Sequence, residues 1–277
     1  MELDSNLLVI QQTERPHAQH NADLIIQSLR SFPTMMLRRE TFPWFIHPHS
    51  HLLSKSEGAA LPEALSTCMG IAQMFASRTS ETKPFLWSTI KAEYRRFANE
   101  EHRMSTFELL AAVQACTIYL IMCIVDQSPE SGETSLDLLS ALHICGVGSL
   151  TQSELSNPSL NWQDWIFAES QRRLSNLWFL IGCAICVKTG VVCDPSQSYR
   201  SLPLPGLKYL WEAPSQAAWE VEYEASRVLQ TSGLVTLGDL IDTQQSGYLV
   251  SNAQKLDKWN AGVDNLGSLL NLAGTMV

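Results

Sequence analysis

Residues 35–51 read Met35-Met36-Leu37-Arg38-Arg39-Glu40-Thr41-Phe42-Pro43-Trp44-Phe45-Ile46-His47-Pro48-His49-Ser50-His51. Pro43 and Pro48 fix their own φ and disfavour a helical conformation in the residues before them, so this stretch cannot be a regular helix. Buried apolar surface stabilises a fold by about 25 cal/mol per Å², and the stretch has large apolar side chains to bury. These are Phe42, Trp44, Phe45 and Ile46. We therefore predict an extended, Pro-containing strap, about residues 33–51, that lies across a helical body.

The rest of the chain shows the apolar spacing of helices. The clearest stripe runs through residues 161–188, with Trp162, Trp165, Ile166, Leu174, Leu177, Trp178, Ile181 and Ile185 three or four positions apart. Residues 106–125 are apolar on nearly all sides and follow a capping box formed by Ser105 and Glu108, which predicts a buried helix. Further helices are expected at residues 18–30, 62–76, 85–101, 134–145, 215–229, 236–241 and 252–276. Four prolines predict a long loop at about 194–214. With no alternating strand and no repeat, the predicted fold class is all-α.

Composition narrows the classes of function. The 277 residues suit one irregular multi-helix domain, predicted at 17–277 after a flexible segment at 1–16. A net charge of −9 argues against direct contact with nucleic acid, which needs clustered Lys and Arg. The apolar run at 109–125 contains Gln114 and lacks basic flanks, so we expect a core helix and no membrane span.

Three histidines in the strap alternate: His47, His49 and His51. On an extended segment they would lie on one side and could bind zinc with a fourth ligand from elsewhere. No fourth ligand is evident, and an ordered turn around Pro48 explains them more simply. We favour a structural role, and we expect neither a metal nor a cofactor.

Three charged residues fall within the apolar stripe of residues 161–188. Glu169 and Arg173 are four positions apart and can pair, and we expect Arg172 to bond carbonyl groups of the strap. A buried ion pair that fixes helix register is the preferred interpretation, with an acid–base site or an anion clamp as the alternative. Gln114, within the apolar helix, is expected to be a buried amide with a local partner.

Cys183, Cys186 and Cys193 have the spacing of half a six-cysteine zinc cluster. The second half is missing, and two of the three lie in a helix rich in Trp and Ile. We expect these thiols to pack as small apolar groups.

A set of motifs, in this order, resembles the C-terminal regulatory region of fungal zinc binuclear cluster transcription factors of secondary-metabolite gene clusters. The motifs are Leu29-Arg30-Ser31-Phe32-Pro33, Met35-Met36-Leu37-Arg38-Arg39, Phe42-Pro43-Trp44-Phe45-Ile46-His47, Leu110-Ala111-Ala112-Val113-Gln114-Ala115, Ile118-Tyr119, Trp165-Ile166, Glu169-Ser170-x-Arg172-Arg173, Leu202-Pro203-Leu204-Pro205, Leu210-Trp211-Glu212-Ala213, Trp219-Glu220 and Leu256-Asp257-Lys258-Trp259-Asn260-Ala261-Gly262-Val263-Asp264-Asn265-Leu266-Gly267. The resemblance extends from about residue 16 to the end of the sequence.

The resemblance implies a nuclear protein that controls expression of a biosynthetic gene cluster. In that family a six-cysteine cluster near the N-terminus contacts DNA, and the present sequence begins after the place where it would lie. Two explanations stay open: a truncated regulator, or a stand-alone form acting through partners. The expected partners are a DNA-binding homologue or a second copy, and a small-molecule effector is an added option.

Two other functions stay open. One is a biosynthetic enzyme, such as a cyclase or isomerase, on a regulator scaffold, with Glu169, Arg172 and the strap histidines shaping a pocket for a hydrophobic intermediate. For localisation, the cytoplasm is the alternative to the nucleus. The other is an inhibitor that binds a full-length homologue through shared helices.

Overall fold

The computed structural model describes residues 16–53, 60–126, 158–190, 197–229, 233–247 and 249–277. It is all-α, as predicted. The longer helices are α1 (Pro16–Leu29), α3 (Glu63–Ala76), α4 (Lys83–Glu100), α5 (Thr106–Asp126), α7 (Trp162–Thr189), α10 (Gln216–Leu229), α11 (Leu237–Gln245), α12 (Val250–Gly262) and α13 (Asn265–Gly274). The shorter ones are α2 (Phe32–Met35), α8 (Gln197–Arg200), α9 (Lys208–Trp211) and the 3-10 turns η1 (Arg39–Thr41), η2 (Ser50–Leu53) and η3 (Glu101–Arg103). The helix predicted at 134–145 and residues 1–15 of the predicted flexible segment lie outside the described residues.

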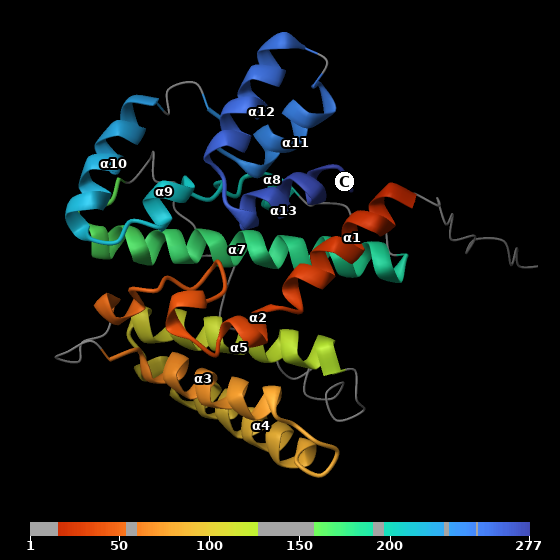
Figure 1. Cartoon of the computed structure of the whole chain (residues 1–277), viewed down its shortest axis with the longest axis vertical. Coiled ribbons are helices and arrows are strands. Elements are labelled where there is room, and N and C mark those ends of the chain that lie inside the picture. Colours follow the sequence, from red (N-terminus) through yellow and green to blue (C-terminus); the bar gives the residue numbers. More distant parts are fainter. Residues whose placement is uncertain (1–15, 54–59, 127–157, 191–196, 230–232, 248) are drawn as a thin grey trace, which may run out of the picture.

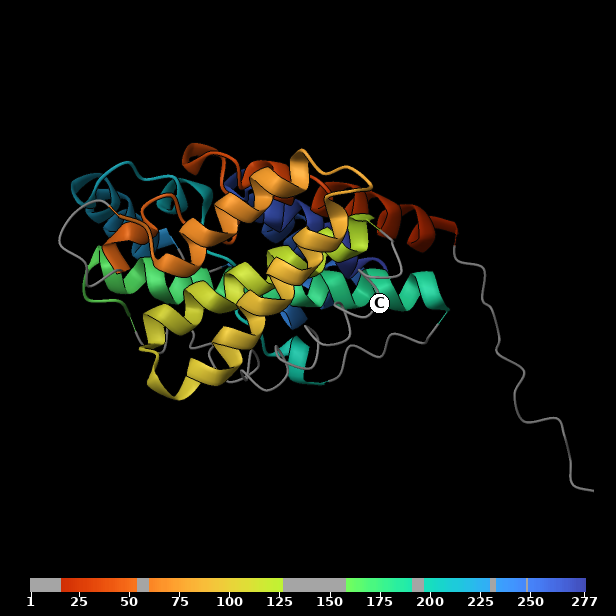
Figure 2. The same ribbon diagram turned by 90° about the horizontal axis from the view of Figure 1, so that it is seen from below.

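Helix α7 organises the molecule. Its 28 residues, about 42 Å at 1.5 Å per residue, cross the middle of the structure (Figure 1). Helices α3, α4 and α5 lie on one side and α8 to α13 on the other, and α1 packs along α7 (Figures 1 and 2). One cluster of buried apolar side chains runs from Ala18 to Met276, so the described helices form a single domain.

Helix α5 is the predicted buried helix. Its residues from Leu110 to Cys123 are all buried, between α2, α3, α4 and α7. By length and composition it could cross a membrane, but 78% of its most apolar window is buried, which is typical of a core helix. Its predicted capping box is present: the Glu108 carboxylate accepts from the Ser105 N–H at 2.7 Å, and the Glu108 N–H donates to Ser105 Oγ at 3.3 Å.

The strap is less extended than predicted. It contains α2, η1 and the start of η2, joined by turns such as the bond from the Ile46 N–H to the Pro43 carbonyl at 2.8 Å. Arg38, with φ −141° and ψ 137°, is extended at the start of η1. The prolines exclude a helix here, and short turns give the backbone N–H and C=O groups local hydrogen-bond partners. A fully extended chain would have left these groups without such partners.

The C-terminal helix predicted at 252–276 is two helices. Helix α12 ends at Gly262, Val263 is extended, and Asp264 caps α13 by accepting from the Leu266 and Gly267 N–H groups at 3.0 and 3.2 Å. The apolar spacing continues through this break, so periodicity alone could not reveal it. The signal that was missed is Asp264 at an N-cap position, two residues after Gly262.

The Pro-rich segment predicted as a loop at about 194–214 contains α8 and α9 in its described part. Between them, residues 202–204 run antiparallel to residues 235–237. The Leu204 N–H donates to the Val235 carbonyl at 2.9 Å, and the Leu237 N–H donates to the Leu202 carbonyl at 2.8 Å. This isolated bridge fixes the segment beside α7 and α11.

Helix α11 begins with a reciprocal capping box. Thr236 Oγ1 accepts from the Asp239 N–H at 3.1 Å, and the Asp239 carboxylate accepts from the Thr236 N–H at 2.8 Å. We expect Thr236→Ala to lower the free energy of unfolding by about 1 kcal/mol, the usual cost of losing an N-cap. Urea unfolding followed by circular dichroism checks this, with exposed Thr34→Ala as the matched control expected to stay within about 0.5 kcal/mol of wild type.

Candidate functional site

The strap is held to the helical body by polar bonds as well as by its apolar side chains. Phe42, Phe45 and Ile46 are buried. Gln114 Nε2 on α5 donates to the Phe45 carbonyl at 2.8 Å. The partner that was predicted to be local is therefore 69 residues away along the chain. The strap carbonyl next to it, that of Trp44, accepts from Arg173 at 3.0 Å.

His47 is fully buried, and both of its ring nitrogens are engaged. Nδ1 accepts from the His49 N–H at 3.0 Å, so the ring proton is on Nε2, which donates to the Trp211 carbonyl at 3.0 Å. Burial, with the nearby charges of His49 and Arg173, lowers the pKa of His47 to about 3. The ring is therefore a neutral structural group that joins the strap to α9.

His49 and His51 do not complete a metal site with His47. The His49 ring lies 5.1 Å, centroid to centroid, from the ring of Trp162, and the Arg39 guanidinium contacts His51 Nδ1. Burial and the charge of Arg39 lower the pKa of both rings. A bound guanidinium disfavours a second cation at His51. No group of three potential ligands occurs among the described residues.

Glu169 is part of a buried network of ion pairs on α7. This agrees with the preferred interpretation, a buried ion pair. Its side chain is inaccessible to solvent. Oε1 accepts from Arg173 Nε at 2.7 Å and from the Gly206 N–H at 2.8 Å, and Oε2 accepts from Arg172 Nε at 2.8 Å. Gly206 permits this approach, since a Cβ there would lie 3.2 Å from Glu169 Oε2 and 3.3 Å from the Trp165 ring.

Arg173 is the centre of the network. Besides Glu169, its guanidinium donates to the Trp44 carbonyl at 3.0 Å and to Asp264 Oδ2 at 2.5 Å. It also lies 4.0 Å from the centroid of the Trp211 ring, in cation–π geometry. One side chain thus connects the strap, α7, α9 and the cap of α13.

Arg172 was predicted to bond strap carbonyls, and this prediction is wrong. Neighbouring residues on a helix point about 100° apart, and it is Arg173 that faces the strap. Arg172 instead lines a cavity beside residues 203–207, and its Nε donates to Glu169.

The candidate residues therefore form two groups, and Trp211 links them. One group is His47, His49, His51 and Gln114 at the strap, and the other is Glu169, Arg172 and Arg173 on α7. The Trp211 carbonyl accepts from His47, and its ring carries the Arg173 guanidinium on its face. Trp211 and Asp264 were not singled out as site residues. The only sequence signal for them was their membership in the motifs of the family resemblance.

This geometry does not form the acid–base pocket of the enzyme alternative. Glu169 is buried and accepts three bonds, and neither ring nitrogen of His47 is available to a substrate. The cysteines were predicted to pack as small apolar groups. Cys183 is buried in α7, consistent with that prediction, and Cys193 lies outside the described residues.

Comparisons with known protein families, with characterised proteins and with solved structures found no match to this chain.

Proposed function

We propose that this chain is a transcription regulator, or a regulator-like protein, that controls expression of a fungal secondary-metabolite gene cluster. The proposal rests on the position of the family-resemblance motifs in the fold. Trp44, Arg173, Trp211 and Asp264 come from four of those motifs, spread over 221 positions, and meet in one network. Residues that resemble the family are thus the ones that hold this scaffold together, which supports a shared scaffold.

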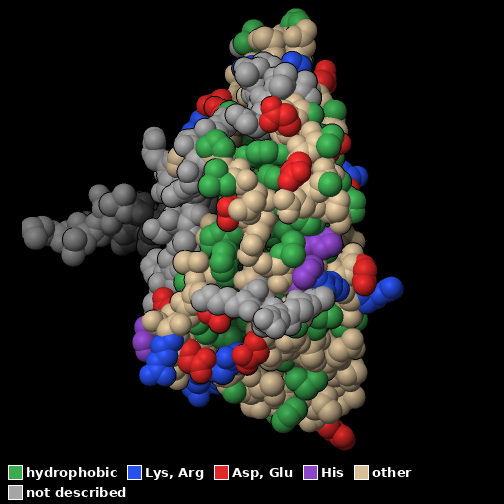
Figure 3. All heavy atoms as spheres, turned by 90° about the vertical axis from the view of Figure 1, so that its left-hand side faces the viewer, with side chains coloured by type: hydrophobic (Ala, Val, Ile, Leu, Met, Phe, Trp, Pro, Cys, Tyr) green, Lys and Arg blue, Asp and Glu red, His purple; other side chains and the backbone are tan. Residues whose placement is uncertain are grey.

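The surface supports action through protein partners. The chain has a net charge of −9. On α4, Arg96 pairs with Glu93 at 2.5 Å and with Glu100 at 3.2 Å, and acidic and basic side chains lie together at the lower left of the face in Figure 3. Such a surface repels a phosphate backbone and suits protein contacts. A DNA-binding homologue or a second copy of the chain is the partner we propose, with action in the nucleus.

Chromatin immunoprecipitation of the tagged native protein tests this role. Under producing conditions we expect enrichment at promoters of one biosynthetic gene cluster, with the untagged strain as control. Enrichment should disappear when the DNA-binding partner is depleted. Exclusion of the tagged protein from the nucleus would contradict the proposal.

Gene deletion separates regulation from catalysis. A regulator's deletion lowers the transcripts of the whole cluster together, and all of its metabolites decline. A deletion that leaves these transcripts level while one intermediate accumulates would instead identify the biosynthetic enzyme of the alternative hypothesis.

A further inference from the structure

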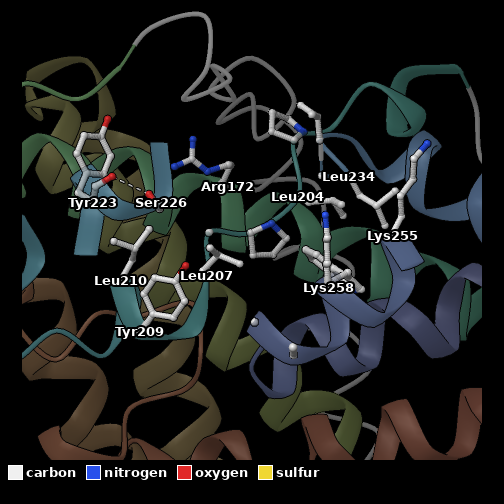
Figure 4. A pocket seen from close by; sticks show the side chains of 18 of the residues that line it. Arg172, Leu204, Leu207, Tyr209, Leu210, Tyr223, Ser226, Leu234, Lys255 and Lys258 are labelled. Carbon is white, nitrogen blue, oxygen red and sulfur yellow. Dashed lines mark hydrogen bonds between the residues drawn. The ribbon is translucent and has the colours of Figure 1, made fainter. Parts of the chain in front are cut away.

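A cavity of about 420 Å³ lies between the 203–207 segment, α10 and α12 (Figure 4). This volume is within the range of small-molecule sites. Its walls are mainly apolar and aromatic. They include Trp165, Leu204, Leu207, Leu210, Tyr223 and Trp259. A cavity of this kind favours a ligand with an apolar body over a hydrated ion.

The charged residues in the described lining of this cavity are all basic. Arg172 on α7 is buried, and Lys255 and Lys258 on α12 are exposed. Figure 4 shows Arg172 on one side of the cavity and both lysines on the other. None of the described lining residues is an Asp or Glu, although acidic residues outnumber basic ones in the chain by 28 to 19. Because Glu169 pairs with Arg172, the positive charge that the described lining adds comes from Lys255 and Lys258.

The three basic side chains, Arg172, Lys255 and Lys258, differ in how they can contact a ligand. Arg172 Nε is bound by Glu169, which holds the guanidinium in place at the wall. Lys255 and Lys258 are exposed on α12, so they attract anions from solution and can pair with a charge at the mouth. An anionic group inside an apolar cavity needs such partners, because a buried unpaired charge is costly.

We propose that this cavity binds an amphipathic organic anion: an apolar, chain-like or aromatic body with one carboxylate or equivalent acidic group. The apolar body lies against the leucine and tryptophan side chains, and the acidic group pairs with the basic ones. The inference stands on the cavity alone and extends beyond the proposed function. A binding failure would leave the regulatory role intact, and loss of that role would leave binding intact.

The probe for the test is 1-anilinonaphthalene-8-sulfonate, an apolar anion whose fluorescence rises when it leaves water. It is bound to the purified full chain and then displaced by decanoate or by decanol. We expect decanoate to displace the probe at about tenfold lower concentration than decanol, because only decanoate has a charge to pair. Equal potency of acid and alcohol would overturn the proposal.

Charge reversal at the mouth tests the lysines. The double variant Lys255→Glu with Lys258→Glu should weaken decanoate binding about tenfold, and added salt should weaken wild-type binding. The control is Arg30→Glu with Arg95→Glu, which changes the net charge equally at exposed sites remote from the cavity and should bind as wild type does. Equal weakening in both double variants would refute a role for these lysines.

Filling the cavity tests its location. Ala261 and Ala253 are both exposed on α12, but only Ala261 lines the cavity. Ala261→Phe should abolish binding of the probe and decanoate, and Ala253→Phe should leave both unchanged. Near-ultraviolet circular dichroism establishes that both variants are folded. Full binding by a folded Ala261→Phe variant would place the probe elsewhere and overturn the proposal.

Discussion

Replacing Arg173 with methionine is expected to lower the free energy of unfolding by about 3–5 kcal/mol, the usual cost of removing one partner of a buried ion pair. The change leaves Glu169 without one of its three donors and Asp264 without its short contact. It also removes the donor to the Trp44 carbonyl and the cation on the Trp211 face. Equilibrium urea unfolding, followed by tryptophan fluorescence, measures the effect.

Two further variants separate charge from general damage to the fold. Arg173→Lys keeps the positive charge but cannot make several directed bonds at once, so we expect an intermediate loss. Arg95→Met, an arginine exposed on α4, is the matched control and should stay within about 0.5 kcal/mol of wild type. A loss at Arg173→Met no larger than the control's would contradict a central role for this side chain.

A double variant tests whether Glu169 and Arg173 act as a pair. Glu169→Gln removes the buried negative charge that Arg173→Met leaves behind. The combined loss should therefore fall short of the sum of the single losses by about 1–3 kcal/mol. Strict additivity would mean that the two side chains stabilise the fold independently.

The helices themselves could be predicted from local sequence. The apolar spacing of residues 161–188 and the capping box at Ser105 needed no information from the rest of the chain, and both were confirmed. The prediction failed where the chain changes direction. The break at Asp264 is set by a cap, and the strap's turns are set by local backbone bonds that apolar periodicity does not detect.

The candidate site was predictable only in part, for a related reason. The pairing of Glu169 with Arg173 follows from their spacing of four residues on a helix. The rotation of α7 about its axis, relative to its neighbours, decides which of the two arginines faces the strap. The spacing of residues along the sequence does not predict that rotation. Trp44, Gly206 and Asp264 reach Arg173 from distant parts of the sequence, so only tertiary structure could reveal them.

Acid is expected to destabilise the protein through His47. Its pKa is about 3 in the folded chain and returns toward 6.5 on unfolding, so the unfolded chain binds the extra proton between these values. The contribution of the neutral ring is fully present above about pH 6.5 and is lost as the pH falls toward 3, up to about 5 kcal/mol at 1.36 kcal/mol per pKa unit. The lowered pKa values of His49 and His51 act in the same direction.

His47→Gln tests the size of this contribution. The variant should be less stable at neutral pH by about 1–3 kcal/mol, since a glutamine cannot reproduce both bonds of the ring in the same geometry. Its stability should nevertheless fall less steeply than that of wild type in urea unfolding series between about pH 7 and pH 4, because the group that takes up a proton on unfolding is gone. His17→Gln, at an exposed position on α1, is the control and should keep the wild-type slope. If His47→Gln also kept the wild-type slope, the acid sensitivity would have to arise from other groups. The His47 ring, bonded to His49 and Trp211, would then not be the neutral structural link that its two bonds indicate.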